Sequence, residues 1–462
     1  MTEPGPGRAP GGMGPADGPR ASAAPPHAHT ELRRSLGVWS AVAVLVGSTI
    51  GSGIFRVPST VAEATGAVGA ASLLWILGGI VAVAGALTIA ELATMYPRSG
   101  GVYVYIREAW GPLPAFLFGF TQLVVIRPSA LGAIAMIFAA YVRTFFPGLT
   151  DLHVRIIAAG AIAVLGLINY RSLVWAAVID NVTTAAKVLA LAGLAAIAFM
   201  FGDFSGGALA GPIKFSPLSW GGFGVALIAV MWTYDGWADL TFIAGEVKDP
   251  GRTLPRALLG GTAIIMLVYL AVNVAYLFVL TLDEMAGSAL VAADTATHIF
   301  GRAGAAIVGS LVMLSAFGAL TASMITGPRI FWAMADDRLF FKPIAAVHPR
   351  YGTPHVAILL ATLLGIAYVS IRTFEQMADA FILGIWPFYA LAVGAVFILR
   401  RRHPDAPRPY RTIGYPLVPL IFLVASVGML ANALVEQPVS TLIGFGLILA
   451  GVPVYYIWQR RR

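Results

Sequence analysis

Small and polar residues interrupt the first apolar segment of the chain, where unwinding would free backbone amides and carbonyls to bind a ligand. The run Gly47-Ser48-Thr49-Ile50-Gly51-Ser52-Gly53-Ile54-Phe55 lies in the middle of an apolar stretch at residues 36–64. Glycine costs about 1 kcal/mol relative to alanine inside a helix, so this run is expected to unwind. The freed amides of Ser52, Gly53 and Ile54 would suit an anion such as a carboxylate.

A second interruption is Trp232-Thr233-Tyr234-Asp235-Gly236-Trp237. The carbonyls of Trp232 and Thr233 could accept hydrogen bonds from an ammonium group, and the indole of Trp232 could close over the ligand. The carboxylate of Asp235 is costly in a membrane unless it is paired or faces a watery cavity. It could bind the basic part of a substrate, carry a proton or pair with a cation of the protein. Two interrupted spans in corresponding halves of a chain indicate a transport site.

Both interruptions also have a purely structural interpretation. Gly47 and Gly51 form a Gly-x-x-x-Gly pattern, which lets two helix backbones touch. The indole of Trp232 could equally pack inside a helix bundle or anchor at the membrane interface.

Lys187 and Arg127 are cations deep inside apolar segments, where each requires a partner. Lys187 could supply a fixed positive charge where a sodium-driven carrier holds a metal ion, or its chain could snorkel to the interface. Arg127 precedes Pro128 and is interpreted as structural. We expect it to pair with Asp235 or Glu91, or to reach the carbonyls that Pro128 leaves without a donor.

Other charges follow the sixth apolar segment or end the eighth, and we interpret them as a cytoplasmic gate network or as solvated loop pairs. They are Glu246, Lys248, Asp249, Arg252, Arg329 and Asp336. The histidines have no metal-ligand spacing, so no metal is expected. No set of nucleophiles, histidines or acidic pairs converges at one depth, so the sequence does not favour an enzyme, and no cofactor is expected.

The elements that must position these residues are membrane-spanning helices. Of the 462 residues 58% are hydrophobic and only 11% charged, and the mean hydropathy is +0.82. A soluble domain usually carries about 25% charged residues, so the chain belongs to the membrane class. The arginines behind the net charge of +8 lie in short loops, where lipid headgroups are a better partner than nucleic acid.

A span requires roughly 20 apolar residues, and the sequence contains about twelve such segments. An amphipathic stretch at residues 98–110 follows the second span. A polar loop at residues 281–302, with a short helix, follows the seventh. The twelve predicted spans are residues 36–64, 69–96, 113–145, 154–170, 172–201, 221–246, 255–280, 303–335, 354–371, 377–399, 415–434 and 439–458.

The two interruptions fall in the first and sixth spans, which predicts a repeat of five spans used twice in opposite orientation. The expected organisation is a disordered cytoplasmic tail at residues 1–33 and a transport core at 34–400. The core would comprise repeats at about 34–201 and 221–400, and two additional spans with a basic C-terminus would occupy 401–462. Arginines concentrate in alternate loops, which places both termini in the cytoplasm of a multi-pass cell-membrane protein.

Motifs across the chain after residue 33 resemble the amino acid–polyamine–organocation superfamily, and within it the L-type amino acid transporter branch. The motifs are Gly51-Ser52-Gly53-Ile54-Phe55, Glu91-Leu92-Ala93-Thr94-Met95-Tyr96-Pro97-Arg98-Ser99-Gly100-Gly101, Ile126-Arg127-Pro128-Ser129, Tyr234-Asp235-Gly236-Trp237 and Glu246-Val247-Lys248-Asp249-Pro250. The resemblance implies the leucine-transporter fold, all α-helical, and alternating access.

The resemblance also assigns roles to individual residues. It implies that an amino acid carboxylate binds the amides near Ser52 and Gly53, and that its amino group meets carbonyls near Ile50, Trp232 and Asp235. Trp232 matches a gating aromatic. Lys187 matches the lysine that replaces a sodium site in sodium-independent members, where it contacts the first helix and an eighth-helix serine, here Ser315. The expected substrate-binding set is Thr49, Ile50, Ser52, Gly53, Ile54, Trp232, Thr233, Asp235 and Gly236.

The chain departs from this branch in two respects. It has no cysteine, so it cannot form the disulfide that links animal members to a heavy chain, and a stand-alone prokaryotic carrier is expected. Asp235 replaces a small residue, which resembles the members that exchange cationic amino acids. We therefore expect a sodium-independent amino acid exchanger for neutral and, with Asp235, cationic substrates. The alternatives are a proton-coupled amino acid or polyamine symporter of the same fold and a non-transporting nutrient sensor.

Overall fold

The computed structural model describes residues 2, 32, 34–51, 53–146, 148–201, 206–213, 215, 219–288 and 290–460. Over these residues the regular structure is helical, and an isolated bridge between Leu36 and Val247 is the one extended pairing. The predicted tail at 1–33 and the final two arginines lie almost wholly outside the described residues.

All twelve predicted spans correspond to helices in the described part of the chain. Nine helices are long and apolar enough to cross a membrane, one bent pair forms a further span, and two shorter apolar helices complete the set. The bounds are α1 Val38–Thr49 with α2 Gly53–Thr65, α3 Val68–Met95, α5 Pro112–Thr121 with α6 Arg127–Phe145, α7 Asp151–Arg171, α8 Leu173–Phe201, α9 Trp220–Tyr234, α11 Pro250–Val279, α14 Arg302–Asp336, α15 His355–Ile371, α16 Phe374–Arg402, α17 Leu417–Glu436 and α18 Pro438–Arg460.

Shorter elements occupy the loops. The predicted amphipathic stretch contains α4 (Val102–Trp110), and the polar loop after α11 contains two short helices rather than one, α12 (Leu282–Gly287) and α13 (Val291–Phe300). Thr281 caps α12 by accepting the amide of Glu284, whose carboxylate accepts the amide of Thr281 in return. A 3-10 turn, η3 (Lys342–Ala345), follows α14.

The first and sixth spans are broken where the sequence predicts. α1 and α2 meet at an angle of 41°, and the two short elements α10 (Asp239–Phe242) and η2 (Ala244–Glu246) continue the sixth span beyond α9. Asp235 is extended, with ψ 152°, and Gly236 has φ +110°, a conformation that residues with a side chain rarely adopt. The chain therefore leaves the helix at Asp235 and turns sharply at Gly236.

The third span contains an irregularity that the sequence analysis did not predict. Residues Gln122–Ile126 form a π-helical turn, η1, between α5 and α6. Pro128 has no amide hydrogen to give the carbonyl of Val124, and the hydroxyl of Tyr368 donates to that carbonyl instead. Arg127 is thus not needed at the freed carbonyl, and its side chain is directed elsewhere.

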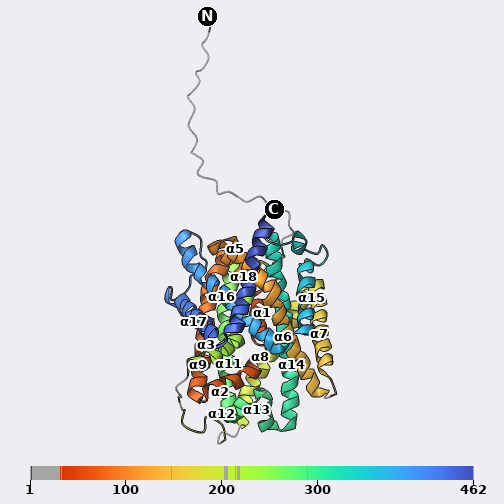
Figure 1. Ribbon diagram of the computed structural model, residues 1–462, viewed down its shortest axis with the longest axis vertical. Helices are drawn as coiled ribbons and strands as arrows, with labels where there is room; N and C mark the ends of the chain where they lie inside the picture. The colour runs from red at the N-terminus through yellow and green to blue at the C-terminus, as the bar shows by residue number, and fades with distance from the viewer. Residues whose placement is uncertain are drawn as a thin grey trace.

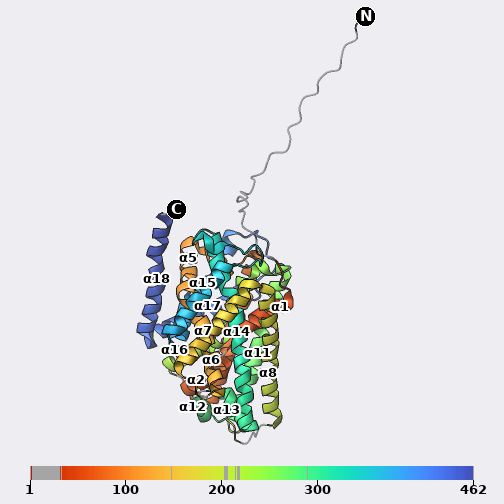
Figure 2. The ribbon, with the colours of Figure 1, turned by 90° about the vertical axis from the view of Figure 1, so that its right-hand side faces the viewer.

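The first and sixth spans run in opposite directions through the bundle. Figure 1 shows α2, the second half of the first span, at the same end as α12 and α13, and α9, the first half of the sixth span, in that same half of the molecule. The C-terminal end of α18 lies at the opposite end. Figure 2 shows α18 on the outside of the bundle, where it packs on α5 and α16.

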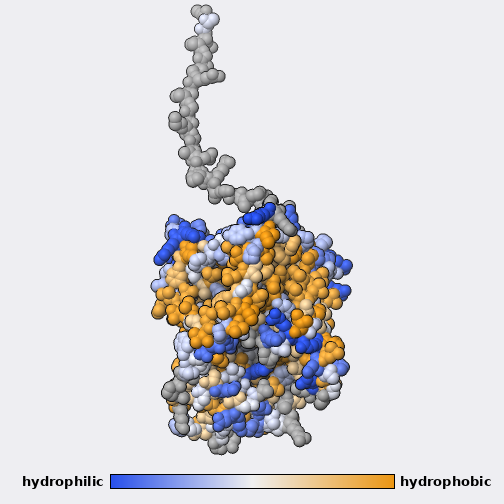
Figure 3. Space-filling model, viewed as in Figure 1, coloured by the Kyte–Doolittle hydropathy of each residue, from blue (hydrophilic) through white to orange (hydrophobic). Residues whose placement is uncertain are grey.

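Apolar side chains cover the outside of the bundle, as a protein surrounded by lipid requires. Figure 3 shows hydrophobic residues spread over most of one face, with hydrophilic residues concentrated near the ends and in a patch on the lower half. Helices on the outside expose large apolar side chains, among them Leu189, Leu267, Leu363, Val424 and Ile443. A water-soluble protein rarely exposes so many large apolar side chains together.

Glu91 joins the ends of α3 and α16 to the loop that leads into α17. Its buried carboxylate accepts hydrogen bonds from the Arg400 guanidinium at 2.6 and 2.9 Å and from the Thr412 amide at 2.7 Å. The guanidinium of Arg408 lies 3.3 Å away. The expectation that Glu91 pairs with Arg127 is therefore wrong, because Arg400 at the end of α16 and Arg408 in the following loop already surround it.

We predict that Glu91→Gln destabilises the protein, because the variant leaves the charge of Arg408 buried beside a neutral amide. Breaking a buried ion pair typically costs roughly 3–5 kcal/mol. Thermal unfolding of the detergent-purified protein would measure the loss. Asp151→Asn is the matched control, since the Arg143–Asp151 pair is exposed and such pairs contribute about 0–1 kcal/mol. Equal unfolding temperatures for the two variants would contradict the prediction.

Candidate functional site

The two broken spans touch each other in the middle of the bundle through glycines. A Cβ atom built on Gly236 would come within 2.8 Å of the Thr49 amide nitrogen, and one built on Gly53 within 2.9 Å of the Thr233 Cα atom. Both distances are shorter than real Cβ contacts. Each break thus supplies a glycine against which the backbone of the other packs.

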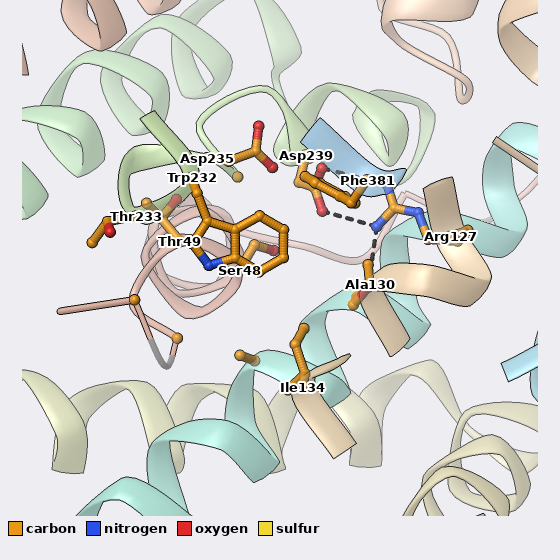
Figure 4. Close-up of a pocket in the computed structure, with 15 residues that line it drawn as sticks. Ser48, Thr49, Arg127, Ala130, Ile134, Trp232, Thr233, Asp235, Asp239 and Phe381 are labelled. Carbon is orange, nitrogen blue, oxygen red and sulfur yellow. Dashed lines mark hydrogen bonds and ion pairs between the residues drawn. The ribbon is translucent and has the colours of Figure 1, made fainter. Parts of the chain in front are cut away.

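A cavity opens beside this contact and encloses about 550 Å³ of space not filled by atoms, including its opening. Of the residues predicted for substrate binding, six line the cavity (Figure 4): Thr49, Gly53, Trp232, Thr233, Asp235 and Gly236. Ile50 and Ile54 are buried beside it, and Ser52 lies outside the described residues.

Other spans supply cavity residues that the sequence analysis did not predict. They are Ser48 and Gly51 in the first span, Arg127, Ala130 and Ile134 in the third, Asp239 in the sixth, Ala319 and Ser323 in the eighth, and Phe381 in the tenth. Most of these types are common in any apolar helix, so no local pattern distinguishes them. The charges of Arg127 and Asp239 inside apolar spans were the available signals.

The indole of Trp232 forms part of the cavity wall and packs against the tenth span. Its ring meets that of Phe381 edge to face, with centroids 5.0 Å apart and an interplanar angle of 89°. Trp232 is only partly buried, and Figure 4 shows its ring lying across the cavity. The structure places this side chain in the cavity and excludes the alternative in which it anchors at the membrane interface.

Tyr269 of α11 links the two breaks, a role that no sequence pattern indicated. Its hydroxyl lies 2.9 Å from the carbonyl oxygen of Thr49 and 3.1 Å from that of Thr233. Both carbonyls belong to peptide groups at the ends of helices, where the usual helical donor is missing. One buried phenol therefore stabilises the unwound backbone of both spans.

Lys187 binds the carbonyls of the first break. Its ammonium donates to Gly47 O at 2.8 Å and to Ile50 O at 2.7 Å, and lies 3.5 Å from Ser315 O. The hydroxyl of Ser315 donates to Ile50 O at 3.1 Å. Lys187 is 1% exposed, so the snorkelling alternative is wrong. Asp180 on the same helix is close enough to interact electrostatically with Lys187.

These contacts occupy one of the carbonyls expected to hold a substrate amino group. A carbonyl oxygen has two lone pairs, and that of Ile50 already accepts from Lys187 and Ser315. The carbonyls of Trp232 and Thr233 each accept one hydrogen bond, from the Asp235 amide and from Tyr269, so each keeps one lone pair.

Arg127 pairs with Asp239 rather than with Asp235 or Glu91. Its guanidinium nitrogens lie 3.2 and 3.5 Å from the two carboxylate oxygens of Asp239. The carboxylate of Asp235 instead interacts with the phenol of Tyr389. The sequence placed Arg127 inside a span but did not identify its partner, because helix pairing across the bundle determines which acid it meets.

A second buried ion pair closes the end of the bundle where α1 begins. Arg329 meets both carboxylate oxygens of Glu246 at 2.8 and 3.2 Å, and both side chains are buried. The carbonyl of Glu246 also accepts the amides of Ser35 and Leu36. The pair is therefore not a solvated loop contact: it joins the eighth span to the end of the sixth, whose backbone in turn binds the start of the first.

Comparison with known proteins finds similarity along most of the chain. The family model described as amino acid permease matches residues 36–458. The chain is 32% identical over 440 residues to the serine/threonine exchanger SteT of Bacillus subtilis (strain 168), covering 94% of this chain and 99% of that protein.

Two mammalian relatives are similarly close. Identity is 30% to the b(0,+)-type amino acid transporter 1 of Homo sapiens, covering 93% of this chain and 88% of the relative. It is 33% to the large neutral amino acids transporter small subunit 2 of Mus musculus, covering 96% and 85%.

We predict that Tyr269→Phe loosens both breaks at once, because the substitution removes the donor shared by Thr49 and Thr233. A lost hydrogen bond of about 1 kcal/mol would make amide exchange in the two breaks roughly fivefold faster. Hydrogen–deuterium exchange of residues 47–54 and 232–237 would measure this. Tyr456→Phe, on the exposed face of α18, is the control. Faster exchange in one break alone would contradict the shared role.

Proposed function

The chain belongs to the amino acid permease family, and we propose that it is a sodium-independent amino acid exchanger that works by alternating access. It is a multi-pass membrane transporter of the leucine-transporter fold, not an enzyme. The observation that carries the proposal is the cavity between two broken spans, in which free peptide groups and charged side chains face one another. A small zwitterion needs both kinds of group.

The first break holds the substrate carboxylate in this proposal. The N–H groups in the first turn of α2, at Gly53 and Ile54, have no acceptor within their own helix, and the helix dipole favours an anion there. Ser52 would contribute a further amide. Gly51 lines the cavity next to it.

The second break holds the substrate ammonium. The carbonyls of Trp232 and Thr233 each have a free lone pair, and Asp235 supplies a negative charge at the same edge of the cavity. Thr49 and Gly236 shape the wall between the two groups. Ile50 remains in the proposed set with a supporting role. Its carbonyl anchors the first break to Lys187 and Ser315.

Transport would follow from movement of these helices. Trp232 acts as the gate that covers the bound substrate, and the Glu246–Arg329 pair opens when the cavity turns to the side where α1 begins. We assign that side to the cytoplasm together with both termini. Residues 34–400 form the moving core, with repeats at about 34–201 and 221–400, and residues 401–462 add two peripheral spans.

Sodium independence follows from the position of Lys187. Its ammonium already donates to the carbonyls of Gly47 and Ile50. A cation bound to these same oxygens would lie against that fixed charge, and the repulsion would be strong at this depth. Substrate binding therefore needs no metal ion to complete the first break.

Counterflow in proteoliposomes tests the function. Purified protein in vesicles loaded with unlabelled neutral amino acid should accumulate labelled amino acid from outside, and replacing external sodium with choline should leave the rate unchanged. Empty vesicles should show little uptake. Uptake into empty vesicles driven by an imposed pH gradient would favour a proton-coupled symporter, and no movement of label at all would favour a sensor.

We predict that Asp235→Asn lowers exchange of arginine and lysine relative to exchange of neutral amino acids. The carboxylate would otherwise offset the cost of bringing a basic side chain into the cavity, and hydrogen bonds to charged groups contribute about 1.5–3 kcal/mol. Competition by arginine against a labelled neutral substrate would measure the ratio. Equal competition in the variant and the wild type would contradict contact between Asp235 and a basic side chain.

A further inference from the structure

The charged residues that line the cavity, within the described part of the chain, are one arginine and two aspartates: Arg127, Asp235 and Asp239. The other fully buried cation near the breaks, Lys187, is directed away to the carbonyls of α1. Any acidic group on a ligand in this cavity would therefore depend on Arg127 for a positive partner.

Polar partners surround the guanidinium of Arg127 and contact each of its three nitrogens. One terminal nitrogen lies 3.2 Å from Asp239, 3.1 Å from the Ser323 hydroxyl and 3.3 Å from the Thr326 hydroxyl. The other terminal nitrogen lies 3.5 Å from Asp239, and Nε lies 3.4 Å from the Gln122 side-chain oxygen. Figure 4 shows the Arg127–Asp239 pair at one side of the cavity.

Asp239 is fixed in this position by the break itself. It opens α10, three residues after the turn at Gly236, and its amide donates to the carbonyl of Gly236. The hydroxyl of Thr326 donates to its carboxylate at 3.0 Å. Asp239 is only 5% exposed, and its carboxylate faces Arg127 rather than bulk water.

We propose that Asp239 determines specificity by cancelling the charge of Arg127, so that the exchanger rejects acidic amino acids. With the pair intact, Asp235 is the remaining charged residue of the described cavity lining, and it faces the substrate ammonium in the proposed binding mode. The carboxylate of a glutamate side chain would find the charge of Arg127 already balanced by Asp239, and would find no other cation among the described residues that line the cavity. A buried charge left without a counter-charge is one of the devices by which a site rejects the wrong ligand.

Removing the charge of Asp239 should convert the same guanidinium into an anion site. Asparagine has nearly the shape of aspartate and can still accept a hydrogen bond from Arg127. The arginine would then carry an uncompensated positive charge at the cavity wall, and arginine binds carboxylates well because its planar fork matches both oxygens. The selectivity of the carrier would shift toward acidic side chains.

The inference rests on the proposed exchange function, and glutamate against glutamine is the sharpest test because the two differ in charge but hardly in size. The experiment measures exchange of each amino acid by wild type, Asp239→Asn and Asp239→Asn/Arg127→Gln in proteoliposomes. We expect the glutamate-to-glutamine ratio to rise about tenfold in Asp239→Asn, equivalent to about 1.4 kcal/mol. The glutamate-to-glutamine ratio should fall again in the double variant. Asp151→Asn, which alters an exposed acid, is the control and should show the wild-type ratio.

The outcomes separate the inference from the proposed function. Failure of the wild type to exchange any amino acid would overturn the function. Glutamine exchange by Asp239→Asn without a gain in glutamate exchange would overturn the inference alone, as would a gain that persists without Arg127. If Asp239→Asn does not fold, the wild type decides: inhibition by excess glutamate equal to that by glutamine would overturn the inference.

Discussion

Peptide groups inside a membrane must find hydrogen-bond partners in the protein, and this requirement organises the centre of the molecule. Lipid offers no donors or acceptors, so a helix that unwinds at membrane depth needs neighbours that replace its lost bonds. Here three neighbouring spans provide them. Lys187 from the fifth span, Tyr269 from the seventh and Ser315 from the eighth all donate to carbonyls of the first break.

This arrangement separates the peptide groups that hold the structure from those that remain for a ligand. The carbonyls of Thr49 and Ile50 are bound by side chains of the bundle, so they fix the geometry of the first break. The first turn of α2 and the carbonyls of the second break keep unused capacity toward the cavity. Because Tyr269 also binds Thr233, the two breaks are expected to move as one unit rather than independently.

Buried charge in the bundle is organised in pairs that cross between spans. Arg127 with Asp239 lies at the cavity, Arg329 with Glu246 at the end where α1 begins, and the pair of Arg400 with Glu91 joins α3 to α16. An unpaired charge at such depth would be strongly unfavourable, whereas a pair is tolerated if its geometry is good. Two of these pairs join the sixth span, which contains the second break, to the third and eighth spans.

The sequence by itself determined the properties that depend on neighbours along the chain. Apolar length placed the twelve spans, glycines and small polar residues located both breaks, and the charge of Lys187 inside a span marked it as functional. The choice of partners was decided only by the tertiary structure. The sequence suggested Asp235 or Glu91 as the partner of Arg127, whereas the structure pairs it with Asp239. Tyr269 looks like any aromatic residue in an apolar helix. Which groups lie within hydrogen-bond distance depends on how helices far apart in sequence are rotated against one another, and no local pattern encodes that rotation.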